Sequence, residues 1–111
     1  MRAFVMAWRR MSQRTLRITI QESQAAIEIK LEGRIAGLWV AELARTWAEI
    51  MPLQNSRRMS IDLRNTTYAD AGGIQVLRDI YAQTAADLVT STPWTQYLAE
   101  EVTRESANQV N

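Results

Sequence analysis

One stretch decides the fold of this 111-residue chain: Met59-Ser60-Ile61-Asp62-Leu63-Arg64-Asn65-Thr66-Thr67-Tyr68-Ala69-Asp70-Ala71-Gly72-Gly73. Apolar and polar residues alternate over positions 59–63, which predicts a strand with one buried face. Turn-forming residues at positions 65–67 break this alternation. Asp70 then stands before three small residues and a helical apolar repeat that starts at Ile74, so we expect it to cap a helix.

The first turn of this predicted helix carries almost no side chains, since it begins with Ala71, Gly72 and Gly73. Its backbone N–H groups are therefore open to a partner or to an anion. The alternative interpretation is a tight strand-to-helix connection with no binding role. Nucleotide binding is disfavoured, because no companion lysine or glycine-rich cradle accompanies the helix start.

Two alternating runs precede this stretch, at residues 16–20 and 27–31. A short polar segment at residues 22–24 joins them, which predicts an antiparallel hairpin. The residues predicted to be buried include Ile18, Ile29, Ile61 and Leu77. The residues predicted to lie largely in solvent are Thr15, Arg17, Thr19, Glu28 and Lys30.

Helical spacing takes over after Gly37. We expect a first helix to stop at Pro52 and to pack through Val40, Leu43, Ala44, Trp47 and Met51. A second helix is expected to run to about Gln83, followed by a short strand at 87–90. Thr92 and Pro93 then have the residue types of an N-cap and a first helical position, and the last helix is expected to pack through Trp94, Leu98 and Val102.

The order of these elements predicts an α/β fold. It comprises a small mixed β-sheet, made of an N-terminal antiparallel hairpin followed by parallel crossovers, packed with about three main helices. The domain is expected to cover residues 15–105. Residues 1–14 are interpreted as a basic N-terminal extension, either disordered or upstream of a true start at Met11, and residues 106–111 as a polar tail. The alternatives for residues 1–14 are a basic anchor at a membrane surface and a partner-binding arm.

Residues 62–73 resemble the pattern of the STAS family. In this chain they read Asp62-Leu63-Arg64-Asn65-Thr66-Thr67-Tyr68-Ala69-Asp70-Ala71-Gly72-Gly73. That pattern runs Asp-Leu, a small turn, Thr, an aromatic, an apolar residue and Asp-Ser-Ser-Gly. Leu31-Glu32-Gly33-Arg34-Ile35 is similar to the family's upstream Leu-x-Gly-x-Ile/Leu segment. The resemblance covers about residues 15–104, and it implies the same mixed sheet. The family includes bacterial anti-sigma factor antagonists, stressosome scaffold subunits and subunits of lipid-transport ABC complexes.

The sequence departs from this family at its regulatory position. In the antagonists, a partner kinase phosphorylates the second serine of Asp-Ser-Ser-Gly, and Gly72 stands there in this chain. Ala71 replaces the first serine. Neither residue can accept a phosphoryl group, so we expect no phosphorylation at the family position. Thr66 and Thr67 carry the hydroxyls of the preceding loop, and their expected role is to stabilise the turn. The alternative is that one of them accepts a phosphate in place of the missing serine.

The composition gives little support to an enzyme, a metal site or a nucleic-acid site. The net charge is +1, without the footprint of a nucleic-acid-binding protein. The chain has no cysteine and no histidine, so thiolate ligands and the commonest general base are both absent. No nucleophile lies beside a base in the sequence, and no carboxylates have metal-ligand spacing. Asp62 is expected to bond to its own loop or to a helix cap. We therefore expect no catalysis, no cofactor and no metal.

Other side chains have less specific expectations. Trp47 and Trp94 are expected to lie in the core, whereas Trp39, which is off the apolar stripe, is a candidate for an interface. Glu100 and Glu101 are expected to form a solvated face.

The resemblance implies a non-enzymatic, cytoplasmic, protein-binding regulatory module similar to the anti-sigma factor antagonists. The implied partner is an anti-sigma factor or kinase-type regulator, and homodimerisation stays open. The alternative is a structural subunit of an ABC transport complex, bound to the transporter ATPase and without a transmembrane segment of its own. The expected partner-binding residues are Thr66, Thr67, Tyr68, Asp70, Ala71, Gly72, Gly73, Ile74 and Gln75.

Overall fold

The computed structural model describes residues 4–9, 16–54 and 56–108, and within them it forms six strands and three helices. The strands are β1 (Phe4–Arg9), β2 (Leu16–Glu22), β3 (Ala26–Ile35), β4 (Arg58–Asp62), β5 (Thr66–Ala69) and β6 (Asp87–Val89). The helices are α1 (Leu38–Gln54), α2 (Ala71–Thr84) and α3 (Pro93–Asn108). None of these three helices has the length and apolar character needed to cross a bilayer.

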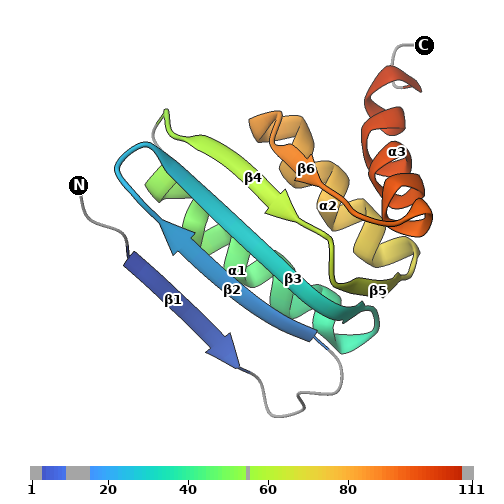
Figure 1. The fold of residues 1–111 in the computed structure, drawn as a ribbon, viewed down its shortest axis with the longest axis horizontal. Helices are drawn as coiled ribbons and strands as arrows, with labels where there is room; N and C mark the ends of the chain where they lie inside the picture. The colour runs from blue at the N-terminus through green and yellow to red at the C-terminus, as the bar shows by residue number, and fades with distance from the viewer. Residues whose placement is uncertain (1–3, 10–15, 55, 109–111) are drawn as a thin grey trace.

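The strands form one mixed sheet in the order β1-β2-β3-β4-β6, and β5 also pairs with β3 (Figure 1). The pairs β1–β2 and β2–β3 are antiparallel, whereas β3–β4, β4–β6 and β3–β5 are parallel. The first half of β3, residues 26–30, pairs with β4, and the end of β3 from Gly33 pairs with β5. The predicted α/β class, with an antiparallel hairpin followed by parallel crossovers, is confirmed.

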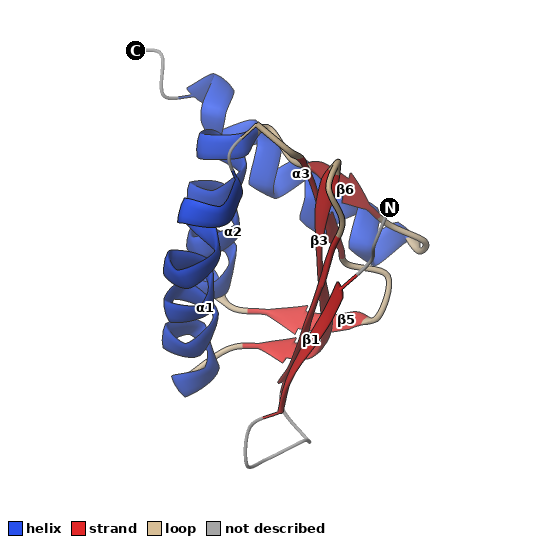
Figure 2. Ribbon diagram, turned by 90° about the vertical axis from the view of Figure 1, so that its left-hand side faces the viewer, coloured by secondary structure: helices blue, strands red, loops and turns tan. Residues whose placement is uncertain are grey.

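Helices α1 and α2 cover one face of the sheet (Figure 2), and α3 packs mainly against α2. The core lies between the two layers and is built largely from the inward side chains of β2, β3 and β4. Ile18, Ile29, Ile61 and Leu77 are all buried, as predicted. The alternation of apolar and polar residues in the strands therefore gives the correct inner face.

The helix-free face of the sheet is less open than the sequence predicted. Arg17 is exposed, but Thr19, Glu28 and Lys30 are only half-exposed. The register places Lys30 between Thr19 and Asp62, so neighbouring side chains cover part of its surface. Thr15 lies outside the described residues.

Strand β1 was not predicted. The sequence interpretation separated residues 1–14 from the domain, whereas the structure pairs Phe4–Arg9 with β2, from Phe4 opposite Glu22 to Arg9 opposite Arg17. This segment lacks the polar–apolar alternation used to recognise the other strands. The expectations for residues 1–3, for residues 10–14 with the alternative start at Met11, and for residues 109–111 lie outside the described residues. Helix α3 continues to Asn108, three residues past the predicted end of the domain.

Strand β5 replaces a predicted loop. Thr66, Thr67 and Tyr68 were expected to form a turn, but only the two preceding residues, Arg64 and Asn65, turn the chain. The N–H of Thr66 bonds to the carbonyl of Leu63 across this turn at 3.0 Å. Threonine and tyrosine favour strands, so their propensity and the free edge of β3 together overcome the turn signal.

Helix α1 is rotated relative to its predicted orientation. Ala44 and Met51, expected in the core, are exposed, and Val40 is only partly buried. The fully buried positions are Leu43, Thr46, Trp47 and Ile50. The helix also continues past Pro52 to Gln54, because a proline so near the end removes only one backbone hydrogen bond from the last turns.

The predictions for two tryptophans and for two glutamates of α3 are only partly confirmed. Trp39, the interface candidate, packs against the core, whereas Trp94 is 37% exposed in the first turn of α3. Glu100 is exposed as expected. Glu101 instead forms salt bridges with Arg78 at 3.6 Å and Arg104 at 3.2 Å, and its side chain is only 18% exposed.

Candidate functional site at the start of helix α2

The predicted partner-binding residues all fall within residues 66–75, where β5 leads into α2, and we call this segment the β5–α2 corner. Strands β3 and β5 run parallel, so their carboxyl ends meet at one edge of the sheet. Helix α1 begins just after β3 and α2 just after β5. The corner therefore brings two helix starts close together.

Asp70 holds this corner together. Its carboxylate accepts a hydrogen bond from the N–H of Gly73 at 2.8 Å, as the predicted N-cap. It also accepts one from the N–H of Gly37 at 3.1 Å, and its own N–H donates to the carbonyl of Ile35 at 3.1 Å. These bonds stabilise the ionised form, so the pKa of Asp70 is lowered, chiefly by the bond from Gly73 and next by that from Gly37.

Gly73 is required by close packing of α2 on β3. A Cβ atom at this position would lie 2.4 Å from the carbonyl oxygen of Ile35 and 2.8 Å from its Cγ2. Both distances are far below van der Waals contact, and the first involves backbone that cannot rotate away. Gly73 is accordingly buried, and its lack of a side chain allows the start of α2 to pack closely on the end of β3.

Gly72 has the opposite environment. A Cβ there would meet Asp70 Oδ1 at 3.5 Å and Val40 Cγ1 at 3.6 Å, which are ordinary contacts. Gly72, Ala71 and Gln75 are exposed, whereas Ile74 is half-buried and packs against the core. The surface of the corner therefore consists of small side chains and one amide at the start of α2.

Strand β5 adds both an anchor and an exposed pair. Thr66 is 3% exposed, and its hydroxyl donates to the carbonyl of Leu31 at 2.9 Å. Thr67 and Tyr68 are exposed. The guanidinium carbon of Arg34 lies 4.3 Å from the centroid of the Tyr68 ring, a cation–π contact. Arg34 was not predicted as a site residue, because only the parallel pairing of β3 with β5 places it opposite Tyr68.

Asp62 does not belong to the corner, because its carboxylate bonds to Arg64 in the turn after β4. Its two oxygens accept hydrogen bonds from Nε and Nη2 of Arg64, at 3.0 and 2.9 Å, and the Arg64 N–H donates to the same carboxylate at 3.0 Å. The hydrogen bonds from the Arg64 side chain are the main cause of its lowered pKa. This confirms the prediction of a carboxylate that bonds its own loop.

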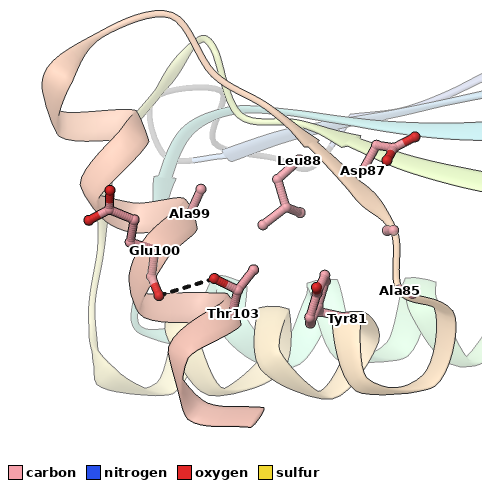
Figure 3. A pocket seen from close by; sticks show the side chains of 8 residues that line it. Tyr81, Ala85, Asp87, Leu88, Ala99, Glu100 and Thr103 are labelled. Carbon is pink, nitrogen blue, oxygen red and sulfur yellow. Dashed lines mark hydrogen bonds between the residues drawn. The ribbon is translucent and has the colours of Figure 1, made fainter. Parts of the chain in front are cut away.

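A separate hollow of about 290 Å³ opens between α2, β6 and α3 (Figure 3). Leu88 points into it, with Tyr81 and Ala99 on the surrounding walls. Glu100 and Thr103 lie at α3, and the Thr103 hydroxyl donates to the Glu100 carbonyl at 3.3 Å. The hollow is shallow and was not predicted from the sequence. Its lining contains no nucleophile next to a base.

No protein-family model matches the chain, and no curated protein matches it significantly. Among the described residues, no three acidic side chains gather closely enough to hold a metal ion. The β5–α2 corner is therefore described from its hydrogen bonds and packing alone. It is a turn held by the hydrogen bonds of Asp70 and the close packing of Gly73, with small exposed residues on its surface and an Arg34–Tyr68 pair beside it.

Proposed function

We propose that this chain is a non-enzymatic, protein-binding regulatory module that resembles the anti-sigma factor antagonists of the STAS family and is cytoplasmic. The β5–α2 corner is its docking surface, and its partner is a kinase-type anti-sigma regulator. The resemblance of residues 31–35 and 62–73 to the family pattern supports this proposal. It also implies that the switch position of the family is Gly72.

The observation that carries the proposal is the difference between the two glycines of the corner. Gly73 must be glycine because a Cβ would collide with Ile35, whereas nothing in the packing requires glycine at Gly72. Gly72 is nevertheless exposed beside Ala71 on a turn that Asp70 holds rigid. A rigid, exposed surface of small residues suits close approach by a partner backbone, and binding to it requires little ordering.

The absence of a hydroxyl at Ala71 and Gly72 makes the binding constitutive in this proposal. A phosphate at this position would add nearly two negative charges to the docking surface and disturb it. Without that modification, the chain remains in its binding-competent form. Control would then come from the amount of the protein or from its partner.

The test begins with capture of the partner from native cytosol on immobilised wild-type protein, followed by calorimetric titration of the purified partner. Ala71→Glu changes the docking surface, and Ala82→Glu is the matched control, because Ala82 is exposed near the other end of the same helix. The proposal expects Ala71→Glu to weaken binding while Ala82→Glu leaves it unchanged. Equal affinities for both variants contradict it, and capture of a transporter ATPase instead favours the transport-subunit alternative.

A further inference from the structure

Helix α1 is apolar on its solvent face as well as on its core face. Leu38, Met51 and Leu53 are 87%, 45% and 43% exposed. The exposed positions of this helix are Leu38, Ala41, Ala44, Arg45, Ala48, Glu49, Met51, Pro52 and Leu53. A helix that is hydrophobic all round is normally buried all round, and an exposed apolar face of this kind marks an interaction site.

The residues of this face are ordered along the helix. Ala41, Ala44, Ala48 and Met51 recur at alternating spacings of three and four, the spacing of a helix–helix seam. Three alanines in such a seam allow two helix backbones to approach closely. The two charged residues of the face, Arg45 and Glu49, lie one turn apart on one flank of the seam.

Among the described residues, these two charges are only partly matched within one copy of the chain. Arg45 forms a salt bridge with Glu42. Glu49 adds only a smaller Coulomb attraction to Arg45 and forms no salt bridge with another described residue. Arginine preceding glutamate by four residues is the less favourable order within a helix. Glu49 is thus available for an arginine from outside the helix.

We propose that this face binds a second copy of the chain, with the two α1 helices antiparallel across a twofold axis. If Ala44 of one copy lies opposite Ala48 of the other, Arg45 and the Glu49 of the second copy are offset by only about 3 Å along the axis. The same flanks face each other in an antiparallel pair, so two reciprocal Arg45–Glu49 salt bridges form.

The charges of this face favour an antiparallel second copy over a parallel pair and over a membrane surface. A parallel pair would put Arg45 level with Arg45 and Glu49 level with Glu49, without reciprocal bridges. A face with one positive and one negative charge has no net attraction to an anionic membrane surface. Self-complementary charge on an apolar face is the property of a twofold interface.

Sedimentation velocity of the full chain from micromolar to submillimolar concentration tests this pairing. Wild type is expected to dimerise reversibly. Ala48→Gln inserts a longer polar side chain into the seam and is expected to weaken dimerisation about tenfold or more. The matched control is Ala82→Gln on the exposed face of α2, which is expected to leave the dimer unchanged. Circular dichroism checks that both variants keep their fold.

A charge exchange makes the test specific for the antiparallel arrangement. R45E places carboxylates against each other across the axis, and E49R places guanidinium groups against each other, so each variant alone is expected to dimerise at least about tenfold more weakly. An equimolar mixture of R45E and E49R restores complementary pairs and is expected to form a heterodimer. A wild type that stays monomeric, or that binds only neutral lipid vesicles, overturns the proposal. So does a mixture that associates no better than its components.

Discussion

The carboxylate of Asp70 accepts a hydrogen bond at 3.1 Å from the backbone N–H of Gly37, which lies 33 residues earlier in the chain. The same carboxylate caps α2 through Gly73. One side chain therefore fixes the start of α2 and the connection between β3 and α1. This double role makes the corner a single mechanical unit, although its parts are distant in sequence.

Asp70→Ala is expected to loosen both connections together. The amide protons of Gly37 and Gly73 lose their common acceptor, so their hydrogen exchange should accelerate in parallel. Two-dimensional NMR of the exchanging amides measures this directly. Asp79→Ala, which removes an exposed carboxylate from the middle of α2, is the control. Acceleration at Gly73 alone would show that the bond to Gly37 does not form in solution.

Substitution of the two neighbouring glycines by alanine is expected to give opposite results. Gly73→Ala forces a Cβ against the Ile35 carbonyl and should destabilise the protein by about 1–3 kcal/mol through overpacking. Gly72→Ala has room for its Cβ and replaces a helical glycine, so it should be neutral or stabilising by up to about 1 kcal/mol. Urea denaturation measures both free energies of unfolding. Equal values for the two variants would contradict the described packing of α2 on β3.

Ile61→Ala is expected to cost about 2–5 kcal/mol, because Ile61 is fully buried at the centre of the sheet and its truncation leaves a cavity. Ser60→Ala changes the adjacent residue, whose side chain points to the other face of β4, and should cost far less. The comparison uses the same denaturation experiment. A loss below about 1 kcal/mol for Ile61→Ala would remove this residue from the core and refute the strand register.

Stability is expected to fall on acidification below the ordinary aspartate pKa of 3.8. The folded state lowers the pKa of Asp62 through the Arg64 side chain and that of Asp70 through backbone N–H groups. The unfolded chain therefore binds more protons near pH 4, so this stabilisation is complete above the unfolded pKa and is lost as pH falls through the folded values. Denaturation midpoints measured between about pH 6 and about pH 2 test this. In Asp62→Asn and Asp70→Asn, the loss on acidification should be smaller than in wild type.

Gly72→Glu is expected to leave the fold intact and to weaken partner binding. The helix dipole tolerates a negative charge in the first turn of α2, but the long side chain prevents close approach at the corner. A loss of about 2 kcal/mol corresponds to roughly thirtyfold weaker affinity. Calorimetric titration against the captured partner measures it, with circular dichroism as the folding control. Undiminished affinity in a folded variant would show that the corner is not the docking surface.

The fold was predictable where the pattern of residues is unambiguous. The alternation in β2, β3 and β4 and the cap at Asp70 follow from local sequence, and the structure confirms them. The orientation of α1 was not predictable, because apolar residues occur all around this helix and several stripes fit the helical period equally well. Met51 and Ile50 exchange places between the predicted and observed core for this reason.

The candidate site was likewise predictable in part. Its residues were predicted as one contiguous segment, but their separate roles depend on contacts distant in sequence. Nothing local distinguishes Gly72 from Gly73, and only the approach of Ile35 does so. Arg34 likewise contacts Tyr68 only through the pairing of β3 with β5, so nothing within the 66–75 segment indicates that Arg34 belongs to the site.

The division of β3 between two partners has a consequence for how the corner is assembled. Since residues 26–30 of β3 pair with β4 and its end pairs with β5, a slip of one residue in the first pairing displaces the second. Such a slip turns Ile61 outward and carries Asp70 away from Gly37. The geometry at the start of α2 thus depends on the correct register between β3 and β4. A ligand that recognises it selects correctly folded molecules and, by mass action, shifts misregistered chains toward them.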